Sequence, residues 1–369
     1  MRIIQVINVR WFNATAWYGL FLGELLSRHG HEVLMLCLPH TQTLSKVQQS
    51  HLPYRTLPLT SNNPLTVLNT LYSLHKLVSD FKPDLINCHR GESFILFGLL
   101  KKIHSFKLVR TRGDQRLPKK NIFNLWLHNK IADAVITTNT RMFKHFEQSF
   151  KTPKSKLHLV LGGVDTRRFY PDPEARQHLR AKLNWDKNCF GVGLLGRFDR
   201  VKGQKQLIQA IAHLYHKQKL HHLRLVLIGF STALHENTIK NWLKKYNLSH
   251  ISIITGKVSN PKNYINALDL GVIASLYSET IIRAGLEMMA CNIPVIGTKV
   301  GVLPDILPKE ALVEPNNPLQ LAQKIQQCLD KNFLLSILQK EQNTFKTRLT
   351  EQHFYQNTYH IYQKLFAKN

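Results

Sequence analysis

Two glutamates, Glu279 and Glu287, have the spacing that most clearly indicates chemistry, because they lie eight positions apart. That separation is slightly more than two helical turns, and the apolar run between them predicts a helix that begins near Ile282. Glu287 then lies on the helix, and Glu279 lies in the loop before it. The unpaired N–H groups and the positive dipole end at such a helix start bind anions. Carboxylates beside a bound phosphate need hydroxyl partners rather than charge, and a sugar nucleotide supplies both groups.

Two basic side chains, Arg197 and Lys202, lie in a second loop of the same half of the chain. The loop follows a strand-like run, residues 190–195, and a helix is predicted to begin near Gln204. Ligands of open parallel sheets bind beyond the carboxyl ends of the strands. A planar guanidinium and a compact ammonium at that edge suit a diphosphate. If the loop is considered alone, two surface cations of a very basic protein are the alternative explanation.

These loops need parallel sheets to position them, and the chain has the pattern of two such sheets. Short β-branched or apolar runs alternate with longer amphipathic runs, which is typical of βαβ units, and 369 residues are too many for one ordinary core. Strands are predicted at residues 3–9, 33–38, 85–88, 108–111, 134–138, 190–195, 224–228, 251–254, 270–274 and 294–297. The main helices are predicted at residues 19–29, 65–80, 93–103, 141–150, 204–217, 236–246 and 282–290.

The series of elements restarts after a stretch rich in glycine and proline, residues 162–173, which is the predicted hinge. We therefore expect an α/β protein with one Rossmann-like domain at residues 1–163 and another at residues 164–345. Residues 346–369 are predicted to contain a final helix whose aromatic side chains share one face. These side chains are Tyr355, Tyr359, Tyr362 and Phe366.

The composition favours a globular protein with polyanionic partners. The formal net charge is +27, and residues 101–120 alone carry eight Lys or Arg and one acid. Such a field attracts nucleic acid, anionic lipid headgroups or phosphorylated saccharides, and a solvated surface is the alternative for the segment. Five scattered cysteines without a Cys-x-x-Cys pair predict reduced, buried thiols instead of disulfides or a zinc site. The chain has no run of about 20 apolar residues and no signal-peptide pattern, so a cytoplasmic protein is expected.

Taken together, the motifs resemble those of family 4 retaining glycosyltransferases, and the resemblance covers nearly the whole length. It rests on the strand followed by GR-x4-KG at residues 196–203, on the Glu-x7-Glu block, and on GGVDTRRF from residue 162. The stretch ACNIPVIGTKVGVLPDIL is similar to the family's A-x-G-x-PV…G-G-x-x-E, with Asn292 and Val302 for glycines and Asp305 for the acid. The resemblance implies a GT-B fold. In that fold two Rossmann-like domains have parallel sheets facing a central cleft, and a C-terminal helix crosses back to the N-terminal domain.

The resemblance also implies a role for each matching residue. Arg197 and Lys202 are expected to stabilise the departing diphosphate, and Glu279 is expected to engage the donor sugar near its anomeric carbon; these three form the catalytic set. Glu287 is expected to bind the ribose hydroxyls of the donor. The other expected donor-binding residues are Gly196, Val258, Thr280, Ile281, Ile282 and Arg283. The sequence Thr280-Ile281-Ile282 stands where relatives more usually have Gly-Phe-Gly.

The acceptor is expected on the N-terminal domain, where the sequence departs most from the family. The family's glycine loop after the first strand is replaced by an aromatic-rich segment, residues 11–19, which indicates a differently shaped acceptor pocket. The candidate residues are Asn13, Ala14, Thr15, His89, Arg112 and Asp114. A structural or merely exposed role is the alternative for His89, since the chain contains 19 histidines.

The predicted function is metal-independent, retaining transfer of a hexosyl or heptosyl group from a UDP-, GDP- or ADP-sugar to a glycan or glycolipid, such as lipopolysaccharide core. No cofactor or metal is expected, because no Asp-x-Asp motif is present and two cations can neutralise the leaving group. Residues 101–120 are expected to meet an anionic acceptor or lipid at the inner face of the cytoplasmic membrane. The alternatives are a nucleotide-sugar epimerase of the same fold and a basic nucleic-acid-binding protein. No nucleic-acid-binding motif supports the second, and no nucleic-acid partner is expected.

Overall fold

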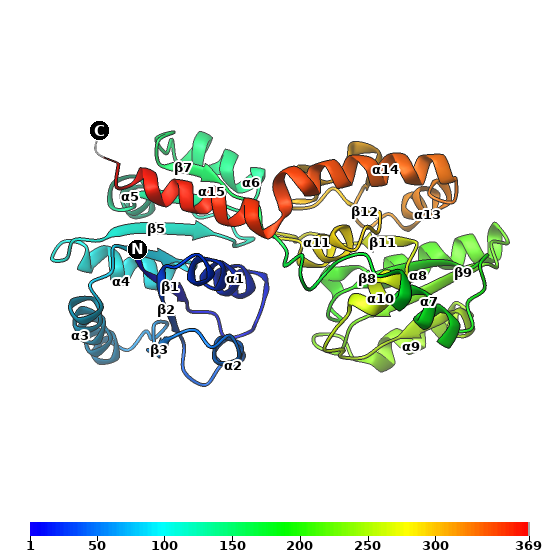
Figure 1. The fold of residues 1–369 in the computed structure, drawn as a ribbon, viewed down its shortest axis with the longest axis horizontal. Coiled ribbons are helices and arrows are strands. Elements are labelled where there is room, and N and C mark those ends of the chain that lie inside the picture. The colour runs from blue at the N-terminus through cyan, green and yellow to red at the C-terminus, as the bar shows by residue number, and fades with distance from the viewer. Residues whose placement is uncertain (368–369) are drawn as a thin grey trace. The chain divides into compact units, whose positions relative to one another are not determined.

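Each half of the chain folds around a parallel β-sheet with helices packed against it (Figure 1). The computed structural model describes residues 1–367. Met1–Gly162 and the chain from Glu351 onward form one compact unit, here unit 1, and Gly163–Thr350 form unit 2. The divisions expected from the sequence fall after residues 163 and 345. Val164 and Thr350, where the chain enters and leaves unit 2, form an isolated parallel bridge.

Unit 1 contains a seven-stranded sheet with the order β3-β2-β1-β4-β5-β6-β7, and every neighbouring pair of strands is parallel. The strands are β1 (Arg2–Ile7), β2 (Glu32–Cys37), β3 (Tyr54–Thr56), β4 (Leu85–Cys88), β5 (Lys107–Arg112), β6 (Ala134–Thr137) and β7 (Leu157–Leu159). The chain moves from β1 to one edge and then from β4 to the other, which is the doubly wound arrangement of Rossmann-like domains. The edge strands β3 and β7 were not predicted, because three residues give too short a pattern.

The helices of unit 1 divide between the two faces of this sheet. They are α1 (Ala14–Arg28), α2 (Gln42–Gln49), α3 (Pro64–Phe81), α4 (Gly91–Leu100), α5 (Ile122–Trp126), α6 (Thr140–Lys144) and α15 (Glu351–Lys364), with π-helical turns at Leu127–Ile131 and His145–Ser149. Residues of α3, α4 and α6 share one apolar core cluster with the strands. Helix α1 begins earlier than predicted, because the Asn13 side chain accepts a hydrogen bond from the N–H of Ala16 and caps the helix.

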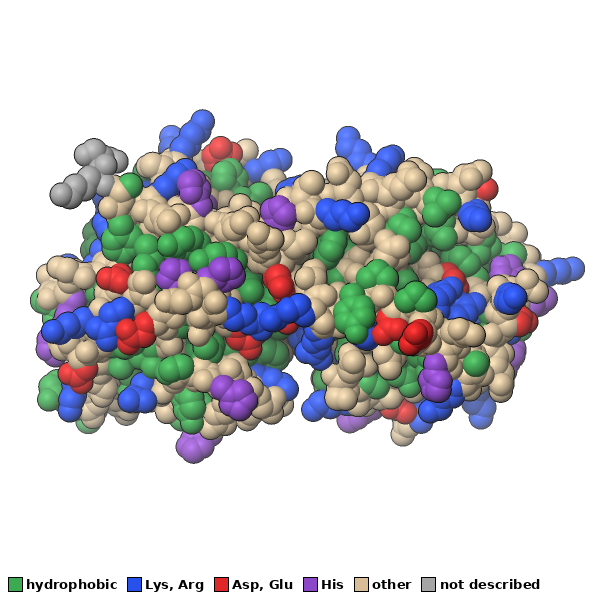
Figure 2. All heavy atoms as spheres, in the orientation of Figure 1, with side chains coloured by type: hydrophobic (Ala, Val, Ile, Leu, Met, Phe, Trp, Pro, Cys, Tyr) green, Lys and Arg blue, Asp and Glu red, His purple; other side chains and the backbone are tan. Residues whose placement is uncertain are grey.

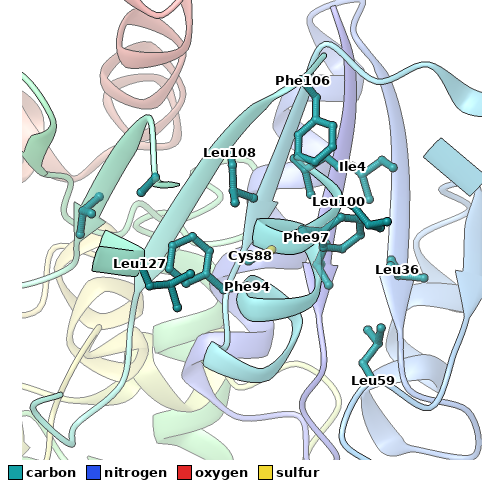
Figure 3. Close-up of a cluster of buried hydrophobic side chains, with 14 of the residues drawn as sticks. Ile4, Leu36, Leu59, Cys88, Phe94, Phe97, Leu100, Phe106, Leu108 and Leu127 are labelled. Carbon is teal, nitrogen blue, oxygen red and sulfur yellow. The ribbon is translucent and has the colours of Figure 1, made fainter. Parts of the chain in front are cut away.

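The apolar core beneath α4 shows why the sequence folds this way. Phe94 and Phe97 lie three positions apart and therefore on the same face of the helix, and both are fully buried. Figure 3 shows them among side chains from the strands, including Ile4 and Leu108. Burial of one such ring stabilises the fold by about 1.5–3 kcal/mol.

The last helix, α15, belongs to unit 1 although the chain reaches it only after unit 2, and it is drawn red beside the N-terminal elements in Figure 1. Tyr362 is fully buried, and its hydroxyl accepts hydrogen bonds from the side-chain amides of Asn87 at 2.8 Å and Gln5 at 3.4 Å. Burial raises the pKa of Tyr362 far enough that the phenol stays protonated. The predicted aromatic face is only partly correct, because Phe366 is 42% exposed and Phe354 is buried instead.

Unit 2 contains a six-stranded sheet with the order β10-β9-β8-β11-β12-β13, again parallel throughout. The strands are β8 (Phe190–Leu195), β9 (Leu223–Ile228), β10 (Ser252–Ile254), β11 (Leu270–Ile273), β12 (Val295–Thr298) and β13 (Leu312–Val313). The α-helices are α7 (Pro173–Lys182), α8 (Gln204–Ala212), α9 (Glu236–Lys245), α10 (Lys262–Ala267), α11 (Arg283–Ala290), α12 (Leu303–Ile306), α13 (Pro318–Gln327) and α14 (Lys331–Thr344). The two sheets confirm the predicted fold class of two Rossmann-like α/β domains.

No helix within residues 1–367 combines the length and the apolar character that crossing a bilayer requires.

Candidate functional site

The loop after β8 carries the two predicted cations, and the structure gives them different partners. Gly196 continues β8, where its N–H donates to the carbonyl of Ile228 at 2.9 Å. The exposed Arg197 guanidinium forms an ion pair with Asp199, with Nη2 at 3.0 Å from Oδ2. Asp199 also accepts a hydrogen bond from the N–H of Val201 at 3.1 Å, so this unpredicted residue shapes the loop.

Lys202 and Glu279 lie 77 positions apart in sequence, and the fold joins them in an ion pair between the lysine ammonium and Oε1 of the glutamate. Glu279 is buried, and the hydroxyl of Ser275 donates to the same oxygen at 2.6 Å. Gly203 makes this approach possible, because its φ is +71° and a Cβ there would lie 1.9 Å from the carbonyl oxygen of Ala274. Two of the three predicted catalytic residues are therefore in direct contact.

The backbone of Glu279 is fixed by the loop after β12. The N–H of Val302 donates to the carbonyl of Glu279 at 2.8 Å. Gly301 has a φ of +61°, and a Cβ at this position would lie 1.7 Å from the same carbonyl oxygen. The loop after β12 can therefore approach the Glu279 backbone this closely only because residue 301 is a glycine.

Helix α11 begins beside this glutamate with an open N-terminus, as the glutamate spacing predicts. The first N–H groups of an α-helix have no partner within it, and the side chain of the N-cap residue of α11, Ile282, makes no capping hydrogen bond. Ile282 occupies the N-cap position with φ 51° and ψ 48°, a left-handed conformation that is strained for a β-branched residue. This is the third position of Thr280-Ile281-Ile282, where relatives more usually have glycine, and the strain explains that preference.

Two further predicted donor residues, Arg283 and Glu287, contact each other on α11. The Nε of Arg283 donates to Oε1 of Glu287 at 2.7 Å, four positions along the helix. Glu287 is buried, whereas the Arg283 side chain is 39% exposed. Val258 lies half-buried in the loop after β10, and Thr280 is half-buried beside Glu279.

In unit 1, Asp114 lies at the centre of an arginine cluster. Its carboxylate is 2.9 Å from Nη2 of Arg110, 3.2 Å from Nη1 of Arg112 and 3.6 Å from Nη1 of Arg90. Burial alone would raise the pKa of Asp114, but the three guanidinium groups outweigh it and hold the pKa below its usual value. Burial, assisted by Arg110, lowers the pKa of Arg112 to about 9. Arg90 and Arg110 were not predicted, because an arginine inside or after a strand has no spacing that marks it.

His89 follows β4 and is fully buried in unit 1. Its Nε2 is 2.8 Å from Oε1 of Gln5 and donates to it, while Nδ1 has no hydrogen-bond partner within residues 1–367. Burial, with the nearby charge of Arg110, lowers the pKa of His89 to about 3, so the imidazole is neutral.

The other acceptor candidates lie at the start of α1. Asn13 caps this helix, and the hydroxyl of the buried Thr15 donates to the carbonyl of Gly113 at 3.0 Å. Ala14 is half-buried between them. The hydrogen bond from Thr15 joins the first turn of α1 to the loop that carries Asp114.

Residues 101–120 do not form one exposed basic surface, because β5 runs through this segment. Arg110 and Arg112 are buried in the cluster around Asp114, and Lys101 forms an ion pair with Asp133 at 2.6 Å. The side chains that remain exposed are Lys102, Arg116, Lys119 and Lys120. Figure 2 shows Lys and Arg spread over the visible surface of each unit instead of gathered in one place.

Comparison with known proteins gives this geometry a family. The model of glycosyl transferases group 1 matches residues 175–348, and the model of glycosyltransferase family 4 matches residues 17–168. The chain is 25% identical over 264 residues to the uncharacterized glycosyltransferase MJ1059 of Methanocaldococcus jannaschii, covering 64% of this chain and 60% of that protein. It is 27% identical over 178 residues to the lipopolysaccharide core biosynthesis mannosyltransferase LpsB of Rhizobium meliloti, covering 47% and 48%. The match thus spans only about half to two thirds of these relatives.

A solved structure shares the fold over the full length. The Anabaena protein Alr3699/HepE, in complex with UDP and glucose, superposes with a TM-score of 0.81 at 19% identity, covering 99% of this chain and 100% of that one. The two family models and this common fold lead to one conclusion. The chain belongs to the group 1 glycosyltransferases, glycosyltransferase family 4, with the GT-B fold.

Proposed function

We propose that this protein is a retaining glycosyltransferase that binds a nucleotide-sugar donor on unit 2 and an anionic glycan or glycolipid acceptor on unit 1. The observation that carries the proposal is the contact between Lys202 and Glu279 beside the open N-terminus of α11. A cation, a buried carboxylate and the positive dipole end of a helix together match a diphosphate joined to a sugar.

The ion pair between Lys202 and Glu279 is the resting state of the proposed site. When the donor binds, its diphosphate meets the ammonium of Lys202 and the N–H groups of α11. Glu279 is then free to accept hydrogen bonds from sugar hydroxyls and to stabilise positive charge near the anomeric carbon. Ser275 keeps the carboxylate in place during this exchange, since its hydroxyl donates to the same oxygen.

The proposed reaction proceeds on one face of the sugar. The bond between the anomeric carbon and the phosphate oxygen breaks, an acceptor oxygen forms the new bond on the same side, and the leaving phosphate takes the acceptor proton. Lys202, Arg197 and the helix N–H groups neutralise the charge of the leaving diphosphate, which is why we propose that no divalent ion is needed. Arg197 takes part only after it leaves Asp199.

The proposed donor is a UDP-sugar, because a structural relative binds UDP and glucose; GDP- and ADP-sugars are the alternatives. A thermal-shift comparison of UDP-, GDP- and ADP-glucose tests this. We expect one nucleotide class to stabilise the wild type and to lose most of its effect in Lys202→Ala and Glu287→Ala. The control is Lys299→Ala, which removes another lysine of unit 2 from an exposed pair with Glu314. Equal shifts in all variants would refute the donor site.

Two assays separate the rivals. An epimerase would convert the donor sugar without any acceptor, which sugar analysis of the nucleotide pool detects. A nucleic-acid-binding protein would bind oligonucleotides that a sugar nucleotide does not displace.

We also propose that unit 1 meets an anionic membrane through the outer side of α3, α4 and α5, here the α3–α5 face. These helices have many exposed apolar side chains: Leu65, Leu68, Tyr72, Ile95, Leu99, Ile103, Ile122, Phe123 and Trp126. Exposed lysines lie on the same helices or in the segments next to them: Lys76, Lys102, Lys119, Lys120 and Lys130. Apolar side chains within a basic rim suit the interface of anionic lipids, and a lipopolysaccharide core acceptor, as for LpsB, would lie at such a surface.

Liposome sedimentation tests the α3–α5 face. We expect binding to vesicles with phosphatidylglycerol to fall several-fold in the double variant Ile122→Glu, Phe123→Glu. The matched control is Leu319→Glu, which changes a similarly exposed apolar side chain of unit 2. If the two variants bind alike, the face is not a membrane contact.

A further inference from the structure

A cavity of about 470 Å³ opens in unit 1 where the loops after β1, β2 and β3 meet. Its wall includes Arg10 and Trp11 from the first loop, His40 and Gln42 from the second, and Thr60 from the third. The volume falls in the range of small-molecule sites. The carboxyl ends of parallel strands are also where open α/β sheets bind ligands. Except for Trp11, which belongs to the segment expected to shape the acceptor pocket, none of these residues was predicted.

The apolar part of the wall offers a stacking surface. Trp11 is 67% exposed, which leaves most of its indole ring in contact with water. Pro39 and Pro58 add rigid apolar surface to the same cavity. A pyranose ring has an apolar face of C–H groups, and that face covers an indole well while its hydroxyls stay available to polar groups.

The polar part of the wall is unused within the protein. Among residues 1–367, the side chains of Arg10, His40, Gln42 and Thr60 take part in no hydrogen bond or ion pair. The cluster around Asp114 is different, because its arginines already have a carboxylate. A donor or acceptor that has no protein partner and lines a cavity is available to a ligand.

The charge of the wall selects among carbohydrates. The ionisable residues that line the cavity are Arg10 and His40, and no acid lines it. His40 also has a left-handed backbone, with φ 53°, a conformation that histidine adopts more often than most residues with a side chain. A guanidinium without a carboxylate partner favours a ligand that brings its own phosphate or carboxylate.

We propose that this cavity binds an anionic saccharide unit of the acceptor, with the sugar ring stacked on Trp11 and the phosphate or carboxylate bound by Arg10. Gln42 and Thr60 then form hydrogen bonds with the sugar hydroxyls. The assignment of this ligand to an acceptor rests on the proposed glycosyltransferase function. The binding of the sugar does not, because every residue involved lies in unit 1 and the proposed donor residues lie in unit 2.

Titration of the full chain, followed by saturation-transfer NMR, tests the cavity. The probes are glucose 6-phosphate, glucuronic acid, glucose and inorganic phosphate. We expect one or both charged sugars to bind at least about tenfold more tightly than glucose, which corresponds to one charge-assisted hydrogen bond. Arg10→Gln should abolish this preference, and Trp11→Ala should weaken every sugar. Arg55→Gln and Tyr54→Ala, exposed residues of unit 1 outside the cavity, should change nothing.

The outcomes distinguish the sources of the anion and the two proposals. A preference for glucose 6-phosphate identifies a phosphorylated acceptor, and a preference for glucuronic acid identifies an acceptor that contains a uronic acid. Equal binding of glucose, binding of inorganic phosphate alone, or no effect of either cavity variant overturns the inference. Trp11→Phe keeps an aromatic ring and should retain sugar binding. Retained binding would rule out misfolding as the cause of the weaker binding in Trp11→Ala. The thermal shift with the nucleotide sugar should be unchanged in the same variants. The absence of any shift in the wild type with UDP-, GDP- and ADP-glucose alike would refute the donor site while leaving the sugar titration intact.

Discussion

The charged clusters at the ends of the two sheets differ in how completely their charges are paired. In unit 1, three arginines surround the single carboxylate of Asp114, and Arg110 is fully buried. In unit 2, Lys202 and Glu279 form one pair beside a helix whose N-cap residue, Ile282, makes no side-chain capping hydrogen bond. The first cluster has three guanidinium groups for one carboxylate, and the Nε atoms of Arg90, Arg110 and Arg112 have no hydrogen-bond partner within residues 1–367. The second cluster pairs one cation with one carboxylate. The difference teaches that the number of charges does not by itself separate a structural cluster from a binding site, and that the hydrogen-bonding capacity left unused in each has to be compared as well.

The largest expected effect is on the arginine cluster around Asp114. Asp114→Asn should lower the free energy of unfolding by about 3–5 kcal/mol, because it leaves buried guanidinium groups without a counter-charge. Urea unfolding of the variant measures this. Glu314→Gln, which breaks the exposed pair with Lys299, is the control and should change the free energy by no more than about 1 kcal/mol. Equal effects would mean that the cluster is not a structural unit.

The pH dependence of this effect has a definite sign. The pKa of Asp114 lies below 3.8 in the folded protein, so its stabilising effect is complete above that pH and is lost as the pH falls through the folded value. The difference between the wild type and Asp114→Asn should therefore be constant above about pH 5 and shrink toward pH 3. A constant difference down to pH 3 would contradict the assignment.

The next effect concerns the open site. Lys202→Ala should lower the rate of sugar transfer by about 100- to 1,000-fold, because it removes one preorganised charge from the leaving group. The measurement is the release of nucleoside diphosphate with acceptor present. The folded state should survive, since the lysine is partly exposed. If Lys202→Ala stays active while Glu279→Gln is inactive, Arg197 and not Lys202 neutralises the leaving diphosphate.

A smaller effect is expected where α15 docks on unit 1. Tyr362→Phe should lower the free energy of unfolding by about 1–3 kcal/mol, because the amides of Asn87 and Gln5 lose the hydroxyl that accepts their hydrogen bonds. Tyr359→Phe changes a half-buried neighbour on the same helix and serves as the control. Thermal melting that shifts equally in both would mean that the buried network contributes little.

The smallest effect compares two adjacent residues of the open site. Ile281 and Ile282 are each 2% exposed, but only Ile282 has a left-handed backbone. Ile282→Gly should therefore destabilise the protein by about 1–2 kcal/mol less than Ile281→Gly, because glycine relieves the strain at one position and not at the other. Denaturant unfolding of the pair measures the difference. Equal losses would show that the strain at the start of α11 is not significant.

The element order was predictable because strands and helices differ in the period of their apolar residues. Phe190–Leu195 was predicted as a strand with the bounds that the structure gives it. The loop that holds Glu279 and the start of α11 were also predictable, since both depend on local spacing. Short edge strands such as Leu312–Val313 were not, because pairing with a neighbour defines them and no period does.

The partners of each charge could not be predicted in the same way. Residues 101–120 were expected to form one basic surface, yet β5 buries Arg110 and Arg112 inside unit 1. The local composition does not show that these two arginines are buried, because the carboxylate of Asp114 reaches them only once the loop after β5 has folded. The cavity between Trp11 and His40 is a further example, because three separate loops form its wall.

The sequence alone determined the two α/β series, the family and the donor motifs, because each depends on residues close together in the chain. Tertiary structure alone decided which charges are paired. It joined Lys202 to Glu279 across 77 positions and placed Ile282, whose side chain makes no capping hydrogen bond, at the start of α11. It also enclosed Asp114 among arginines from two strand ends. The physical reason is that charge and hydrogen bonding act between neighbours in space, whereas periodicity records only neighbours in sequence.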